Sequence, residues 1–296
     1  MQFNVPAQFN RFIGIDWSGA EGRTPSLRAY ECLPGNACPT PIVHPNGWNW
    51  NRTELVNHII HAQQASRLLV GVDFAFAYPF CDSGIGCYFP QYVQSPCTAS
   101  DLWAAIEQIC ANDPDFYGDQ LYNGGANSRF ASYFCTQAGS GPNYEQRFRV
   151  TEQSSQAQGT PPGCTFRCVG PSVGCGTASG IRVLNYLKLN NAFEIWPFYI
   201  PPTRNQSVIV EVYPTFFFAA AGGNRQYQNI TALNAVLSFY GSLPVPAGVA
   251  FNAQDPVDAL VSAAALRNWA GQPNRWNPQT MTPCAQTHEG WIFGVL

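Results

Sequence analysis

Charged residues are scarce in this sequence. They make up 11% of its 296 residues, whereas soluble domains usually carry about 25%. The net charge of −3 argues against a protein that wraps nucleic acid through bulk electrostatic attraction. Hydrophobic residues make up 46% and aromatic residues 14%, which is enough for a large core. The composition predicts a globular protein whose solubility depends mainly on uncharged polar side chains.

Long hydrophobic runs and a secretion leader are also missing. The most apolar segments, LLVGVDFAFAYPF and FFFAAAGG, are too short to span a bilayer. The first residues, MQFNVPAQFNRF, lack the basic start, apolar stretch and cleavage site of a signal peptide. We therefore expect a soluble cytoplasmic protein with no membrane partner. The sequence leaves its oligomeric state open.

Paired C-x-x-C knuckles do not occur among the eleven cysteines. Their odd number and irregular spacing favour mostly reduced thiols over a disulfide framework. A zinc site would have to use Cys164, Cys168 and Cys175, or Cys284 with His288. No placement of Ser, His and Asp residues suggests a hydrolase triad, and nothing in the spacing selects one cysteine as a nucleophile.

Hydrophobic periodicity predicts an α/β sheet. The capping-box pattern of Asn51 and Glu54 predicts a helix start, and the continuous apolar run at 67–79 is typical of a parallel strand buried on both faces. The remaining expected strands are 11–17, 26–33, a short one near 42–43, 192–199 and 207–214. The remaining expected helices are 179–189, 231–241 and 255–271.

Residues 80–180 lack a clear sheet pattern and are rich in Gly, Pro, Ser, Asn and Cys. Helical signals occur only at 99–111 and, more weakly, at 128–138. We interpret the chain, residues 1–296, as a single domain interrupted by this loop-rich insertion. Residues 120–190 hold six basic and two acidic residues, so a basic segment lies within an acidic frame.

Acidic residues follow the predicted core strands. Asp16 ends the first strand and Asp73 interrupts the run at 67–79. Parallel strands place their carboxyl ends on one edge of a sheet, where ligands usually bind. Two neighbouring carboxylates repel each other unless a proton or a cation lies between them, and oxygen ligands suit Mg²⁺ or Mn²⁺. A third acid from the last helix, Asp258 or Asp255, would complete a two-ion site for phosphodiester hydrolysis.

Five segments in order carry a family resemblance: FIGIDWSG, GVDFAFAYP, VEVYP, DPVDALVSAAAL and EGWIFGV. They resemble the predicted nucleases grouped as domain of unknown function 429. The resemblance covers the two ends of the chain. It implies a ribonuclease H-like fold, with a mixed sheet flanked by helices, and metal-dependent cleavage of a nucleic acid whose type stays open.

The resemblance also implies roles for single residues. Asp16, Asp73 and Asp258 match the metal-binding acids of the first strand, the strand after the first helix, and the last helix. Glu211 matches the glutamate of the EVYP segment, as a ligand or as a group that orients one. RVTE at 149–152 is similar to an R-x-T-E segment of the family, which gives Arg149 a phosphate-clamping role. We include Arg147 of the same basic segment in substrate binding.

Other interpretations compete for the same residues. Asp16 and Asp73 could bond backbone groups at turns, and Asp255 before Pro256 fits a helix N-cap, with Asp258 at the third helical position. Glu211 could pair with an arginine such as Arg182 or Arg225, and Arg147 and Arg149 could be solvated surface charges.

Two other functions also stay open. A non-catalytic binding module would use the acids only for capping and pairing. GIDWSGAEG resembles the first phosphate loop of actin-like and sugar-kinase-like proteins, but the sequence has neither a Walker A motif nor G-x-G-x-x-G. Nucleotide phosphotransfer is therefore the weaker alternative.

Overall fold

A six-stranded mixed sheet forms the centre of the protein in a computed structural model, which describes residues 8–170, 172–198 and 206–296. Strand β1 pairs antiparallel with β2 and parallel with β4, and β9 continues the parallel part. The strand order is β3 (Thr40–Pro41), β2 (Arg28–Cys32), β1 (Arg11–Asp16), β4 (Leu68–Val72), β9 (Val208–Glu211) and β8 (Glu194–Ile195). The predicted α/β class with a mixed sheet is confirmed.

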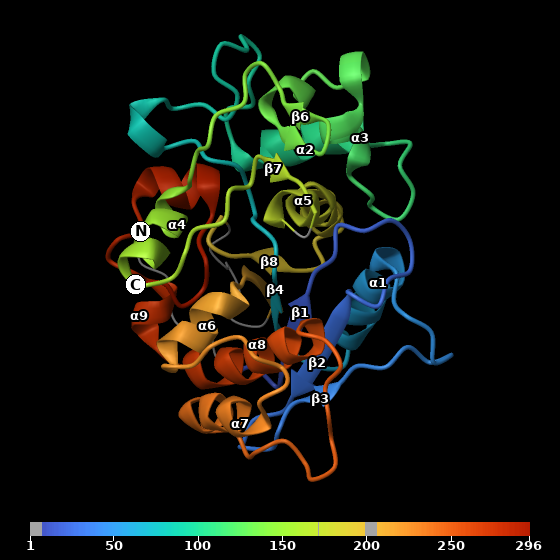
Figure 1. The fold of residues 1–296 in the computed structure, drawn as a ribbon, viewed down its shortest axis with the longest axis vertical. Coiled ribbons are helices and arrows are strands. Elements are labelled where there is room, and N and C mark those ends of the chain that lie inside the picture. Colours follow the sequence, from blue (N-terminus) through green and yellow to red (C-terminus); the bar gives the residue numbers. More distant parts are fainter. Residues whose placement is uncertain (1–7, 171, 199–205) are drawn as a thin grey trace.

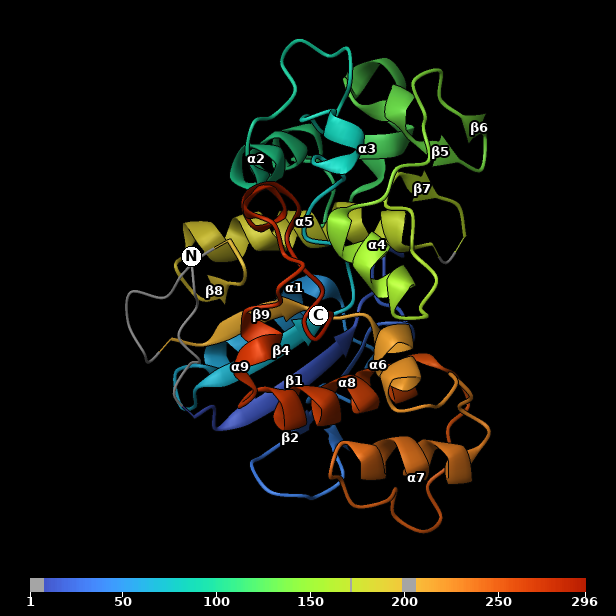
Figure 2. The same ribbon diagram turned by 90° about the vertical axis from the view of Figure 1, so that its left-hand side faces the viewer.

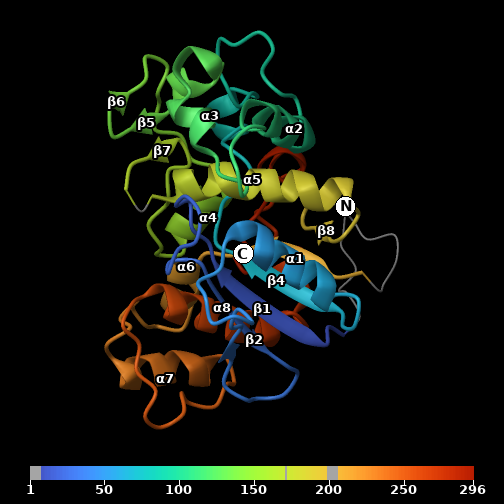
Figure 3. The same ribbon diagram turned by 90° about the vertical axis from the view of Figure 1, so that its right-hand side faces the viewer.

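Helices cover both faces of this sheet (Figures 2 and 3). Helices α1 (Arg52–Ala62) and α5 (Val173–Leu189) lie on one face. On the other face lie α6 (Pro214–Ala220), α7 (Ile230–Phe239), α8 (Asp255–Trp269) and α9 (Pro273–Trp276). The predicted start of α1 is confirmed, because the Asn51 side chain accepts a hydrogen bond from the Glu54 N–H at 2.8 Å.

Two glycines bring α8 close to the central strands. A β-carbon added at Gly14 of β1 would lie 2.3 Å from the carbonyl oxygen of Ala259. One added at Gly71 of β4 would lie 2.8 Å from Leu266 Cδ1. The helix therefore packs against the sheet at a distance that larger strand residues would not allow. This packing carries the acidic first turn of α8 to the edge where β1 and β4 end.

The region 80–180 forms the upper part of the molecule in Figure 1. It contains α2 (Ala99–Ile109), α3 (Asp119–Asn123) and α4 (Val150–Ala157). It also contains a small sheet with the order β6 (Gly139–Ser140), β5 (Cys135–Thr136) and β7 (Arg167–Cys168). The helix expected at 128–138 is wrong: a single 3₁₀ turn, Ala131–Tyr133, precedes β5. Stacked aromatic rings of Phe89, Phe130, Tyr78 and Phe166 hold this part together instead.

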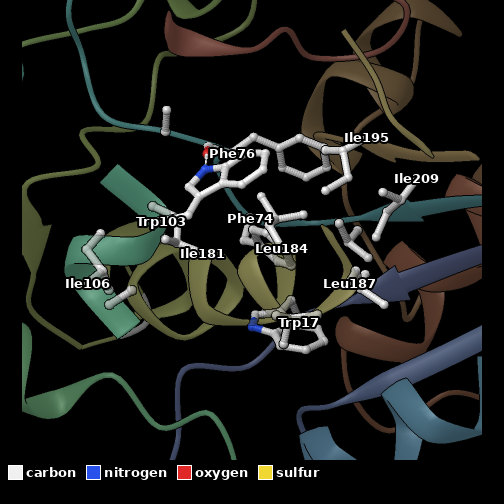
Figure 4. Close-up of a cluster of buried hydrophobic side chains, with 14 of the residues drawn as sticks. Trp17, Phe74, Phe76, Trp103, Ile106, Ile181, Leu184, Leu187, Ile195 and Ile209 are labelled. Atoms are coloured by element: carbon white, nitrogen blue, oxygen red, sulfur yellow. Dashed lines mark hydrogen bonds between the residues drawn. The ribbon is translucent and has the colours of Figure 1, made fainter. Parts of the chain in front are cut away.

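Helix α5 joins the main sheet to the region above it. Figure 4 shows apolar side chains of α5 and α2 packed around residues that follow β1 and β4. The Trp103 indole N–H of α2 donates to the Phe76 carbonyl oxygen at 2.8 Å. A disulfide between Cys81 and Cys284 adds a covalent link between the start of the insertion and the C-terminal segment. The sequence did not indicate this disulfide. The other nine cysteines are free, which agrees with the prediction of mostly reduced thiols.

Among the described ranges, no helix is both long enough and apolar enough to cross a bilayer.

Candidate active site

Asp16 and Asp73 end adjacent parallel strands. Ile15 of β1 pairs with Val72 of β4, and the Asp73 N–H donates to the Ile15 carbonyl oxygen at 3.0 Å. Side chains alternate between the two faces of a strand. Because Gly14 and Gly71 face α8, Asp16 and Asp73, two residues further on, lie toward the same side. The predicted juxtaposition of the two carboxylates is present.

The environment of these two carboxyl groups disfavours negative charge. Burial raises the pKa of Asp16 well above its ordinary value, and the charges of Asp73 and Asp258 raise it further. Burial also raises the pKa of Asp73 to about 8, followed by the charge of Asp258. Neither side chain accepts a hydrogen bond from a described residue. The pair therefore calls for a proton or a cation, and the turn interpretation of both residues is not supported.

The two acids of α8 have different surroundings. Asp258 is fully buried, and its carboxylate accepts from Gln254 Nε2 at 2.7 Å and from the Arg225 guanidinium. Asp255 is half-buried at the mouth of the site. The predicted capping is wrong by one residue, because Gln254 is the N-cap and Asp255 is the first residue of the helix. Asp255, rather than the preferred Asp258, lies on the cleft wall.

Glu211 lines the same cleft, where its charge acts on Asp73, and it is held by Arg149. The Arg149 guanidinium donates to Glu211 Oε2 at 2.8 Å and to Oε1 at 2.5 Å. It also donates to Glu152 Oε1 at 2.8 and 2.9 Å and to the Glu289 carbonyl oxygen at 3.0 Å. All its donors have acceptors and the side chain is 1% exposed. Arg149 therefore has no free donor for a phosphate, which corrects both the clamp and the surface-charge interpretations.

The expected partners of Glu211 are engaged elsewhere, since Arg182 pairs with Glu107 and Arg225 pairs with Asp258. Arg147 is likewise committed to the fold. Its guanidinium donates to Asp82 Oδ1 at 2.6 Å and Oδ2 at 2.8 Å. Neither the predicted substrate-binding role nor a solvated position fits Arg147, which is buried.

A cleft of about 930 Å³ opens above the two strand ends. The sheet side contributes Asp16, Asp73 and Glu211, and the region above contributes Tyr117, Tyr122, Arg167, Cys168 and Cys175. Hydroxyl groups of α5 position the loops between the two walls. Ser179 Oγ accepts from the Trp17 indole at 2.9 Å, and Thr177 Oγ1 accepts from the Ala75 N–H at 3.3 Å.

The polar residues of this cleft that sequence reasoning did not place in the site include Arg167, Arg225 and Ser172. No pattern around Arg225 marks it, because its partner Asp258 is 33 residues away. Ser172 lies in GPSVG, residues 170–174, which has the G-x-S-x-G spacing. Its hydroxyl donates to the Arg167 carbonyl oxygen at 2.5 Å and accepts from the Val169 N–H at 3.0 Å. No described histidine lines the cleft, so this serine has no base within the site.

Some of the carboxylates in the cleft are suited to bind a hard divalent cation. Asp16 and Asp73 supply carboxylate oxygens that accept no hydrogen bond from the described part of the chain, and carboxylate oxygens are the ligands that Mg²⁺ and Mn²⁺ prefer. Asp258 would have to exchange Arg225 for the ion, whereas Asp255 forms no ion pair with any described residue. Within the described residues, no three or more His, Cys, Asp and Glu side chains form a ready-made metal-binding group. The described acids therefore do not form a preformed three-ligand set, and the zinc alternative is unsupported as well, since Cys284 is bonded to Cys81.

Comparison of the chain with protein-family models, with curated proteins and with solved structures found no match in any of the three. The function is therefore inferred from the residues of the cleft.

Proposed function

We propose that this protein is a divalent-metal-dependent phosphodiester hydrolase with a ribonuclease H-like fold, which acts on nucleic acid. The observation that supports the proposal best is the pair Asp16 and Asp73 on adjacent parallel strands, the first buried and the second half-buried, neither with a hydrogen-bond partner among the described residues. A fold retains such a repulsive pair at a cost in stability. A bound cation would offset this cost, because its positive charge would neutralise the two carboxylates.

The order of elements supports the proposed fold family. An antiparallel hairpin, β1–β2, is followed by the parallel strands β4 and β9. Acids lie at the ends of β1 and β4 and in the first turn of α8. This is the arrangement that the sequence resemblance implies for Asp16, Asp73 and the α8 acids.

Asp16 and Asp73 would hold the ion or ions, with Asp255 as the third ligand on the cleft wall. When bound, a divalent ion supplies charge stabilisation to a phosphoryl group and lowers the pKa of a water molecule. Arg225 keeps Asp258 paired and so limits the negative charge next to the site. The Arg149–Glu211 pair fixes the loop after β4, because Glu211 Oε2 also accepts from the Phe76 N–H at 3.0 Å.

Arg167 replaces Arg149 as the proposed phosphate-binding side chain. It is exposed and lies on the wall of the cleft opposite the carboxylates. Tyr117 lies half-buried on the same wall, with the buried Tyr122 next to it, and the accessible part of the Tyr117 ring can stack on an unpaired base. A phosphate backbone would thus meet metal charge on one side and Arg167 on the other.

Cleavage assays with single-stranded, duplex and hybrid oligonucleotides test the proposal. We expect Mg²⁺- or Mn²⁺-dependent cleavage by the wild type, loss of at least about a hundredfold in Asp73→Asn, and no loss in Asp101→Asn. Asp101 is an exposed residue of α2, so its variant controls for the loss of one surface charge. Cleavage that is unchanged in Asp73→Asn would contradict the proposal.

One observation favours a second candidate, a non-catalytic binding module. Arg225 already neutralises Asp258 within the chain, so part of the acid cluster is satisfied without an ion. For such a module, calorimetry would show oligonucleotide binding that survives both Asp73→Asn and removal of divalent ions with a chelator.

A further inference from the structure

Two cysteines face the carboxylates across the cleft. Cys168 ends β7, Cys175 lies in the first turn of α5, and both line the cleft. A glycine allows their elements to come together: a β-carbon added at Gly174 would lie 2.3 Å from the Arg167 carbonyl oxygen. Both thiols are free. The fold thus places two thiols on adjacent elements of one cleft wall, with Cys168 within hydrogen-bonding reach of Cys175.

Helix geometry favours a thiolate at Cys175. The first turn of α5 contains no acidic residue and its N-cap makes no side-chain hydrogen bond to the helix, so the positive end of the helix dipole is not neutralised there. A hydrogen bond from Cys168 lowers the pKa of Cys175 to about 7, against the effect of burial, and the Tyr122 hydroxyl contributes a second hydrogen bond. Burial raises the pKa of Cys168, which keeps that thiol protonated as the donor.

Cys175 also touches the loop that carries the first catalytic candidate. A β-carbon added at Gly19 would lie 2.8 Å from Cys175 Cβ and 2.6 Å from its carbonyl carbon. Gly19 follows Asp16 by three residues, and Trp17 between them is bonded to Ser179 of the same helix. A chemical change at Cys175 therefore occurs in direct contact with the loop of the carboxylate site.

We propose that Cys175 and Cys168 form a redox-active dithiol, in which a peroxide oxidises Cys175 and Cys168 then closes a disulfide. The Cys175 thiolate attacks one peroxide oxygen, so that an S–O bond forms, the O–O bond breaks, and the leaving hydroxide takes up a proton to give water. Cys168 sulfur next attacks Cys175 sulfur, the S–O bond breaks, and the second hydroxide leaves with the proton of Cys168. Two thiols and one hydrogen peroxide thus give one disulfide and two waters.

Peptide mapping by mass spectrometry of the full-length protein tests this assignment without any nuclease assay. After treatment with hydrogen peroxide and blocking of remaining thiols, we expect a Cys168–Cys175 cross-linked peptide. In Cys168→Ser, we expect Cys175 to accumulate as a sulfenic acid that a 1,3-dione probe traps. In Cys175→Ser, we expect Cys168 to stay reduced. The variant Cys110→Ser serves as a matched control, because Cys110 is buried outside this cleft.

The pH profile of alkylation gives a second readout that needs no disulfide. At pH 7 we expect iodoacetamide to modify Cys175 several-fold faster in the wild type than in Cys168→Ala, because alanine has no donor to replace the hydrogen bond that favours the thiolate. The profile should move to higher pH in that variant and stay unchanged in Cys110→Ser. Oxidation that is confined to the exposed Cys97, or an identical profile in all three proteins, would overturn the proposal.

Discussion

The substitution Asp73→Asn should stabilise the protein in the absence of divalent ions. The carboxyl group of Asp73 has a pKa of about 8 in the fold, against 3.8 for an unperturbed aspartate, mainly because of burial. The fold therefore favours the protonated form. Protonated Asp73 contributes its full share to the free energy of unfolding below pH 3.8, and this contribution is lost as the pH rises through about 8. Asparagine keeps the shape of the neutral acid and removes the penalty for ionisation.

The size of the effect follows from the same two pKa values. At about 1.4 kcal/mol per pH unit, the full difference corresponds to an upper bound of about 6 kcal/mol. Asp16 shares the cost of ionisation, and water reaches the pair through the cleft, so we expect about 2 kcal/mol for the single substitution at pH 8. This corresponds to a rise of about 4 °C in the melting temperature for a chain of this size.

Urea unfolding followed by circular dichroism at pH 5 and pH 8, with a chelator present, measures this effect. The gain from Asp73→Asn should be larger at pH 8 than at pH 5. Asp82→Asn provides a control of opposite sign, since Asp82 neutralises the buried Arg147 and its loss should cost about 3 kcal/mol. The reasoning is refuted if Asp73→Asn is no more stable than the wild type at pH 8.

Three further predictions concern the scaffold and the ion. Arg149→Met should lower the free energy of unfolding by about 3 kcal/mol in urea titrations, because it leaves the buried Glu211 without its partner. Gly14→Ala should cost about 2 kcal/mol through its clash with α8, whereas Gly271→Ala, with open space around it, should be neutral in thermal unfolding. Calorimetry should show tighter Mg²⁺ binding as the pH rises from 6 to 9, since the ion displaces protons. Arg225→Gln should tighten Mg²⁺ binding further, because it removes a positive charge next to the carboxylates; weaker binding in that variant would contradict the proposed cation site.

The elements that position the site were predictable because their signals are local. A buried strand that ends in an acid, as at Asp16, breaks an apolar pattern at one point, and Asn51 and Glu54 mark a helix start within four residues. Adjacent parallel strands then place Asp16 and Asp73 together by topology alone. The α/β fold class and the juxtaposition of Asp16 and Asp73 could therefore be predicted from local sequence patterns.

The parts that sequence reasoning missed depend on distant partners. Arg149 and Glu211 are 62 residues apart, and the cysteines of the disulfide are 203 residues apart, so no local spacing reveals either pair. The small sheet has strands of two residues, which are too short to show an alternating pattern. The role of Arg149 in the fold could be recognised only once its buried acceptors were known.

Titration with Mn²⁺ in a calorimeter tests the central claim most directly, namely that Asp16 and Asp73 form a cation site. The wild type, Asp16→Asn and Asp73→Asn should be compared with Asp101→Asn at pH 8. We predict saturable binding by the wild type and Asp101→Asn, and a loss of at least about tenfold in affinity in each of the other two variants. Equal binding by all four proteins, or no binding by the folded wild type, would contradict the account.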